Sequence, residues 1–207
     1  MVSGQSVANT PELDPPVLNV VGERVALGPL RRDLVPAYQR WANDLSAAER
    51  LALLPEPVTL ERQTTRYEQQ ATATDRLLFT IYQTATSRAI GTCGLNEVDH
   101  RQGVAYLAIL IGEAEARGQG YGTEAVRLLL DVAFTALGLH NVMLGVWEYN
   151  YAARRAYARA GFQECGRRRQ GCVLGGRRWD EIFMDCLATE FVSPVLGRVL
   201  IPEDMQS

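Results

Sequence analysis

Three glycines alternate with other residues in the stretch Arg117–Gly122. Glycine adopts positive φ angles readily and has no Cβ, so such a loop can bring backbone N–H groups close to an anion. Residues 104–111, before the loop, are rich in strand formers, and the residues after it have the apolar spacing of a helix. Because a helix N-terminus presents unpaired N–H groups, this order predicts a phosphate site. The alternative is a tight turn that binds nothing.

Two common phosphate loops do not match this stretch. A dinucleotide fingerprint needs a glycine at the sixth position, which is Thr123 when the count starts at Gly118. A nucleotide-triphosphate loop needs a lysine, and all 21 basic residues of the chain are arginine. The pattern that remains is R-x-x-G-x-G.

This pattern resembles the loop that holds the acyl-CoA pyrophosphate in the GCN5-related N-acetyltransferases (GNAT family). Residues 150–157, followed by 160–162, resemble that family's N-x-x-A-x-x-x-Y…G-F segment. Residues 22–27 resemble its opening strand, and residues 90–95 its central hairpin. The resemblance covers about residues 22 to 187, and among the subgroups it is similar to the ribosomal-protein alanine acetyltransferases.

The resemblance implies acetyl-CoA, or another acyl-CoA, as the cofactor. Its pyrophosphate is expected at the glycine loop and its pantetheine amides along the strand that ends at residue 111. The cofactor-binding residues that the resemblance implies are Leu110, Ile111, Arg117, Gly118, Gln119, Gly120, Tyr121, Gly122, Thr123, Asn150, Ala153 and Arg154.

Tyr157 matches the family tyrosine that gives a proton to the departing thiolate. The alternative is that its ring only packs in the core. An acceptor amine must also lose a proton before it can attack, which requires a base or a water chain that leads to one. We expect Tyr106 and Trp147 to lie in the acceptor cleft. Many relatives have a glutamate at the position of Tyr106, and a tyrosine, with a pKa of about 10, is a poor base at pH 7.

Three other residues are therefore candidates for the base. Glu97 follows the strand 90–95, and His100 lies in the next connection. Glu148 ends the strand that leads to Asn150. Each could equally be a solvated surface residue.

Two functions follow from these residues. The first is an N-acyltransferase that acetylates a primary amine of a small molecule or a protein N-terminus. The second is an acyl-CoA-binding module without catalysis, which the missing glutamate at Tyr106 favours. Tyr157 favours catalysis, because a binder has no need of a proton donor near the thiol.

The elements that must position these residues form an α/β fold with a mixed sheet. Strands are expected at 25–30, 77–82, 89–95, 104–111, 142–146, 162–168 and 179–187, with helices at 33–45, 62–70, about 121–138 and 150–161. The strands 104–111 and 142–146 are joined through a helix, so they should be parallel. The family resemblance implies that this pair splays within a mostly antiparallel sheet flanked by helices.

The chain divides into an N-terminal tail (1–20), one acyltransferase domain (21–187) and a C-terminal extension (188–207). The apolar residues of the extension need a cover, either the domain itself or a second subunit of a homodimer. A net charge of −3 argues against nucleic acid as a partner. The sequence shows no signal peptide, no membrane span and no zinc-like cysteine spacing. We therefore expect a cytoplasmic protein without a metal site.

Overall fold

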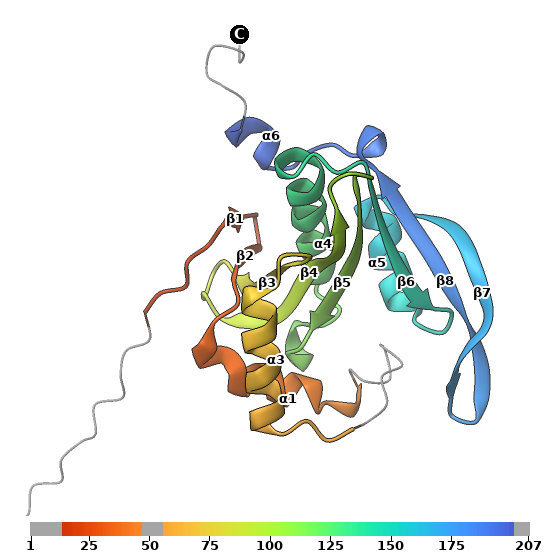
Figure 1. The fold of residues 1–207 in the computed structure, drawn as a ribbon, viewed down its shortest axis with the longest axis horizontal. Coiled ribbons are helices and arrows are strands. Elements are labelled where there is room, and N and C mark those ends of the chain that lie inside the picture. The colour runs from red at the N-terminus through yellow and green to blue at the C-terminus, as the bar shows by residue number, and fades with distance from the viewer. Residues whose placement is uncertain (1–13, 47–55, 201–207) are drawn as a thin grey trace, which may run out of the picture.

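A computed structural model describes residues 14–46 and 56–200 (Figure 1). Its centre is an eight-stranded sheet in the order β1-β2-β3-β4-β5-β6-β8-β7. The strands are β1 (Val20–Val21), β2 (Val25–Pro29), β3 (Leu77–Gln83), β4 (Ala89–Asp99), β5 (Val104–Ile111), β6 (Asn141–Trp147), β7 (Gln163–Leu174) and β8 (Arg177–Leu187).

All neighbouring strands are antiparallel except β5 and β6. These two pair only from Val104 to Tyr106 on β5 with Asn141 to Met143 on β6. Beyond that point β5 stays paired with β4 as far as Ile111, and β6 stays paired with β8 as far as Trp147. The predicted mixed sheet with a splayed parallel pair is thereby confirmed.

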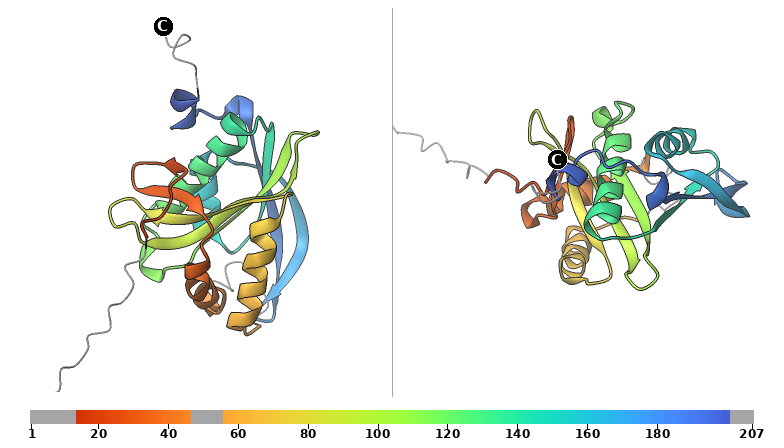
Figure 2. Two further views of the ribbon diagram at one scale, coloured as in Figure 1. Left: turned by 60° about the vertical axis from the view of Figure 1, so that its left-hand side comes forward. Right: turned by 90° about the horizontal axis from the view of Figure 1, so that it is seen from above.

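Helices cover both faces of the sheet (Figure 2). The regular helices are α1 (Val35–Ala42), α3 (Leu60–Thr72), α4 (Tyr121–Asp131), α5 (Tyr151–Ala160) and α6 (Leu196–Val199), and short 3-10 turns span Arg32–Leu34, Ala114–Ala116 and Ala188–Glu190. Helices α4 and α5 pack on the main core, whereas Tyr38 and Trp41 of α1 form a smaller cluster with Tyr67 of α3 and Leu110 of β5. None of the helices in the described ranges is both long and apolar enough to cross a membrane.

Helix α4 carries the predicted apolar stripe, and Val126, Leu129 and Leu130 are buried. It does not continue as a regular helix to Gly138. A π-helical turn (Val132–Ala136) follows it, in which the N–H of Leu137 donates to the carbonyl of Val132 at 3.0 Å. The widened turn ends at Gly138, which has a positive φ of 66° and so stops the helix where the sequence predicted.

The C-terminal extension packs against α4 through one buried carboxylate. Asp131 is fully buried and accepts hydrogen bonds from the backbone N–H groups of Val195 (3.0 Å) and Leu196 (2.8 Å) and from the hydroxyl of Thr135 (2.7 Å). Leu196 is buried, and the ring of Phe191 meets that of Phe134 edge-on at 5.4 Å. Described residues of the extension therefore pack on their own domain, while residues 201–207 lie outside the described part.

We expect Asp131→Asn to lower the free energy of unfolding by about 2 kcal/mol at pH 7. The asparagine amide has only one accepting oxygen, and its NH2 group would face N–H or O–H donors that the carboxylate now accepts from. Desolvation alone would raise the pKa of Asp131, but hydrogen bonds from Ser193, Leu196, Thr135 and Val195 outweigh it and lower that pKa. The stabilisation is therefore present above the unfolded value of about 3.9 and disappears as the pH falls through the lower folded value.

Urea unfolding of the wild type and Asp131→Asn at pH 7 and pH 3 measures this difference. The gap between the two proteins should be large at pH 7 and shrink at pH 3. An equal gap at both pH values would show that the charge of Asp131 is not what anchors the extension.

Candidate functional site

The glycine loop connects the end of β5 to the start of α4. Gly118 and Gly120 have positive φ angles of 72° and 87°, and Gly120 is the residue that caps α4. No side chain caps this helix end among the described residues. Gly122 has no positive φ and lies inside the first turn of α4, so only two of the three glycines serve the conformation that the sequence predicted. The first N–H groups of α4 are therefore left for a ligand.

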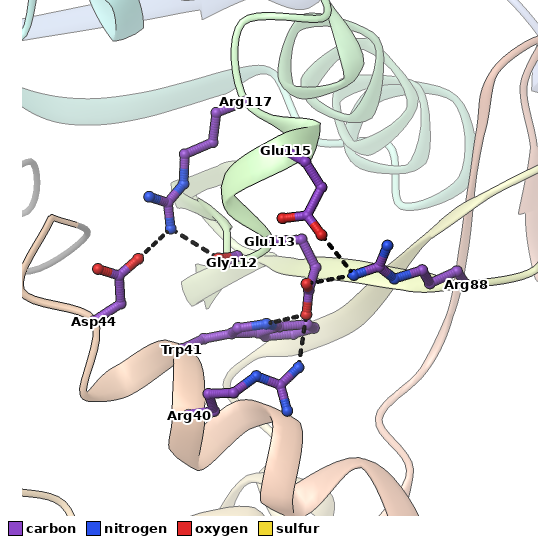
Figure 3. Close-up of polar contacts among 8 residues, drawn as sticks. All are labelled: Arg40, Trp41, Asp44, Arg88, Gly112, Glu113, Glu115 and Arg117. Carbon is purple, nitrogen blue, oxygen red and sulfur yellow. Dashed lines mark hydrogen bonds and ion pairs between the residues drawn. The ribbon is translucent and has the colours of Figure 1, made fainter.

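The side chain of Arg117 anchors the loop to its surroundings (Figure 3). Its guanidinium donates to the carbonyls of Ile111 (2.9 Å) and Gly112 (2.7 Å), to the carboxylate of Asp44 (2.6 Å) and to the hydroxyl of Ser46 (2.6 Å). These contacts lower the pKa of Asp44 to about 2, with the hydrogen bond from Arg117 as the largest cause. Arg117 thus attaches the loop to the segments around it, and its positive charge is already paired with the carboxylate of Asp44.

A second contact joins α1 to the same segment (Figure 3). The indole of Trp41 lies directly on Gly112, where a Cβ would stand only 2.2 Å from the ring. The carboxylate of Glu113 accepts from the indole N–H of Trp41 (2.8 Å) and from Arg40 (2.7 Å) and Arg88 (2.6 Å). Packing and charged hydrogen bonds therefore connect helix α1 directly to the start of the glycine loop.

Two cavities open on the two sides of the splayed strands. The first, which we call the loop cavity, has a volume of about 280 Å³ and lies between the glycine loop, the end of β5 and α5. The second, the α3 cavity, has a volume of about 330 Å³ and lies between α1, α3 and the sheet. Ile109, Leu110 and Tyr157 line both of them. The two cavities therefore meet at the gap between β5 and β6.

The edge of β5 at this gap carries unpaired backbone groups. The N–H of Gly112 donates to the carbonyl of Ile90 at 2.9 Å, in the same register as the β4–β5 ladder. Since bonded and non-bonded pairs alternate in an antiparallel ladder, the backbone groups of Leu110 face β4, and those of Ile109 and Ile111 face the gap. Arg117 satisfies the carbonyl of Ile111, which leaves Ile109 with groups that a ligand could pair.

Tyr157 extends from α5 to the junction of the two cavities. Its ring packs against Phe162 at a centroid distance of 6.0 Å, and its hydroxyl has no hydrogen-bond partner in the described part of the chain. Burial raises the pKa of Tyr157 to about 12. The hydroxyl is therefore protonated at neutral pH and able to donate a hydrogen bond or a proton.

Most of the residues named for the cofactor line the loop cavity: Leu110, Ile111, Arg117, Gly118, Gly120, Gly122, Thr123, Asn150 and Ala153. Asn150 also caps α5, since its side chain accepts from the N–H of Ala153 at 3.2 Å.

The structure places three other named residues outside the lining of that cavity. Gln119 donates back to the carbonyl of Glu115 at 3.1 Å. The ring of Tyr121 lies under the guanidinium of Arg24, and Arg154 faces Glu164 at 3.6 Å. Their side chains are engaged within the protein, so we assign none of these side chains to the cofactor, while the backbone N–H groups of Gln119 and Tyr121 stay part of the predicted loop site.

The three candidate bases are not brought together, and none lines either cavity. Glu97 is exposed, with a positive φ of 50°, at an irregularity of β4. His100 is exposed in the turn before β5. It therefore lies near the N-terminal end of this strand, whereas the glycine loop follows the C-terminal end. Glu148 forms an ion pair with Arg167 at 3.3 Å.

Tyr106 and Trp147 do not line the α3 cavity either. Tyr106 is 43% exposed and is the last residue of β5 that pairs with β6. Trp147 ends β6, and its ring lies next to Gly171 of β7. We therefore assign no acceptor contact to either residue.

The structure adds residues that the sequence reasoning missed. Arg155 and Arg159 line the loop cavity, and their spacing with Ala152 and Ala156 on one face of α5 could have signalled this. On α3, Gln63, Arg66 and Gln70 have an equivalent spacing and line the α3 cavity.

Glu181 of β8 is a further such residue, and no local pattern marks it. Its Oε1 occupies the space above Gly145, where a Cβ would stand 2.5 Å from it, and Gly145 lines the α3 cavity. The side chain of Glu181 is 16% exposed, and its Oε2 forms an ion pair with Arg168 at 2.6 Å without hydrogen-bond geometry. Glu181 itself does not line the α3 cavity, but its carboxylate lies against Gly145, which does.

Comparisons with known proteins agree with this geometry. Residues 24–163 match the family model of the acetyltransferase (GNAT) domain. The probable N-acetyltransferase YjcK of Bacillus subtilis is 30% identical over 116 residues, which are 56% of this chain and 64% of that protein. The uncharacterized N-acetyltransferase p20 of Bacillus licheniformis is 28% identical over 148 residues, or 72% of this chain and 76% of that protein. The chain thus matches less than two thirds of the length of YjcK.

Solved structures share the fold. The spermidine N-acetyltransferase of Vibrio cholerae, in complex with CoA and spermine, superposes with a TM-score of 0.75 at 23% identity, over 81% of this chain and 97% of that chain. A GNAT acetyltransferase of Bacillus anthracis gives 0.71 at 16% identity, over 83% and 99%. Since the family model matches more than half of the chain, the protein belongs to the GNAT family of acetyltransferases, which use acetyl-CoA.

Proposed function

We propose that the protein transfers an acetyl group from acetyl-CoA to a primary amine by direct attack, with both substrates bound at once. The observation that carries this proposal is the meeting of two cavities at one gap, with Tyr157 in the wall of each. A donor bound in the loop cavity and an amine bound in the α3 cavity would have their reacting groups at this junction.

The residues of the loop cavity fit an acyl-CoA. The N–H groups at the start of α4, next to Gly118 and Gly120, suit a pyrophosphate. The backbone of Ile109 suits an amide of a pantetheine arm, as in the addition of a strand to a sheet edge. Arg155 and Arg159 add positive charge for phosphate. When bound, acetyl-CoA supplies a thioester carbonyl that an amine can attack.

Tyr157 is the proposed acid. A thiolate that leaves near the junction needs a proton or a strong hydrogen bond, and the hydroxyl of Tyr157 is free to give one. With a pKa of about 12 it stays protonated across the usual assay range.

Glu181 is the proposed proton acceptor, directly or through one water. A carboxylate at the edge of the α3 cavity can take the proton that the ammonium form of the acceptor must lose. The position against Gly145 supports this role, whereas Glu97, His100 and Glu148 have no comparable position.

Two classes of acceptor are compatible with this proposal: a small-molecule amine and a protein N-terminus. The narrower resemblance to ribosomal-protein alanine acetyltransferases says little about the acceptor and does not decide between the two. The lining of the α3 cavity by side chains of α1 and α3, with a volume of about 330 Å³, favours a small molecule.

We expect Gly122→Asp to weaken CoA binding by more than about tenfold. The new carboxylate would stand in the wall of the loop cavity, where it opposes the pyrophosphate. Folding should not suffer, because a Cβ at this position meets only Ile111 at an ordinary 3.5 Å, and an acidic residue suits the first helical turn. Calorimetric titration with CoA measures the affinity.

Gly122→Asn is the matched control, since it has the same size without the charge and should keep more of the affinity. An unchanged Kd in a normally folded Gly122→Asp protein would refute the assignment of the loop.

We expect Tyr157→Phe to lower kcat by roughly 100-fold while acetyl-CoA binding and the melting temperature stay close to wild type. The hydroxyl has no hydrogen bond to lose among the described residues, so packing should be kept. Steady-state release of CoA thiol from an amine panel, beside a melting curve, provides both values. Full turnover combined with lower stability would mean that the tyrosine is only a core residue.

We expect Glu181→Gln to lower kcat/KM for the amine by roughly 100-fold at pH 7 and by less at pH 9, where more of the amine is already neutral. The affinity for CoA should not change. Glu164→Gln is the control, because Glu164 is an exposed partner of Arg154 and Arg167. Equal rates for wild type and Glu181→Gln would exclude Glu181 as the base.

A further inference from the structure

Helix α3 presents a polar face to the α3 cavity. Gln63, Arg66 and Gln70 stand at positions i, i+3 and i+7 of the helix, and all three line this cavity. The apolar residues that belong to its wall come instead from α1 and the sheet, among them Trp41 and Leu107. The polar groups available to an acceptor are therefore concentrated on one helix.

Gln63 is a buried amide without a full set of partners. The residue is only 5% exposed, and its side-chain oxygen has no hydrogen-bond partner in the described structure. Leaving such a group unsatisfied destabilises the fold, and polar groups buried in native proteins are nearly always paired. The position predicts that a ligand group completes its hydrogen bonding.

Arg66 is an exposed arginine at the wall of the α3 cavity, and its guanidinium forms no ion pair or hydrogen bond within residues 14–46 and 56–200. Its neighbours on α3 differ in this respect, since Arg62 pairs with Glu56 at 3.1 Å and Glu68 pairs with Arg32 at 2.8 Å. Among the described residues that line the α3 cavity there is no aspartate or glutamate. The cavity therefore offers an anion-binding group and no matching site for a second cation.

We propose that the acceptor carries a carboxylate in addition to its primary amine, and that Arg66 binds this carboxylate while the unpaired side-chain oxygen of Gln63 accepts a hydrogen bond from an N–H donor of the acceptor. This inference rests on the proposed function and specifies its substrate class as an amino-acid-like amine. Arginine suits the task because its planar donor pair matches a carboxylate. A diamine would bring its second ammonium toward the guanidinium of Arg66, which disfavours it.

The experiment compares two matched series of acceptors that differ only at one end. One series is the ω-amino acids from glycine to 6-aminohexanoate, and the other is the diamines of the same chain lengths. Acetyl transfer is followed by thiol release, and binding of each amine to the CoA complex by calorimetry. At the best length, the amino acid should exceed the diamine in kcat/KM and in affinity by at least about tenfold.

Charge reversal at one residue is the decisive variant. Arg66→Glu should invert the preference toward the diamine, and Arg66→Gln should bring the two series together. Arg62→Glu is the matched control on the same helix, because Arg62 does not line the cavity, and it should leave the preference unchanged. All variants should keep the wild-type affinity for CoA.

The outcomes separate this inference from the proposed function. Loss of thiol release with every amine would refute the proposed transfer, while the binding ratio of the two series would still decide the inference. A wild-type preference for diamines, a preference unchanged by Arg66→Glu, or no binding of any amino acid of the series would each overturn it.

Discussion

The short pairing of β5 with β6 is the constraint on which the rest of the site depends. Each strand is bound to its outer neighbour along its whole length, β5 to β4 and β6 to β8, so the parallel contact ends after three residue pairs. Backbone groups that face the gap are left without a strand partner, and buried groups of this kind require a hydrogen bond from elsewhere. A sheet that opens in this way makes room for both cavities and provides an edge for a ligand.

The clamp between α1 and the segment 112–117 keeps that opening in one shape. Trp41 packs on Gly112, Glu113 gathers three donors, and Arg117 links the loop to Asp44. The glycines allow the loop many backbone conformations, but charged hydrogen bonds from Arg117 and to Glu113 attach it to α1 and neighbouring segments. Hydrogen bonds of this kind are among the stronger polar contacts. These contacts therefore connect helix α1, which borders the α3 cavity, to the loop, which borders the other cavity.

The arginines of the site are divided between the two cavities. Arg155 and Arg159 face the loop cavity, where phosphate is expected, and Arg66 faces the α3 cavity. Arg117, by contrast, forms an ion pair with Asp44. The solved relative from Vibrio cholerae was crystallised with spermine, a polycation, although at 23% identity it shares the fold and says nothing about this cavity.

The sequence by itself determined the family, the mixed sheet and most of the lining of the loop cavity, because these depend on local patterns. A glycine loop between a strand and a helix, the stripe that buries Leu129 and Leu130, and the cap at Asn150 all act over a few neighbouring residues. Only the tertiary structure decided which charges are already engaged within the protein. Arg117 meets Asp44 across 73 positions of the chain, and Glu181 reaches Gly145 from another strand. Spacing along the chain does not record such contacts between distant segments. Tyr106, Glu97 and Glu148 were therefore reasonable expectations from sequence, and the position of Glu181 against Gly145 became visible only in the tertiary structure.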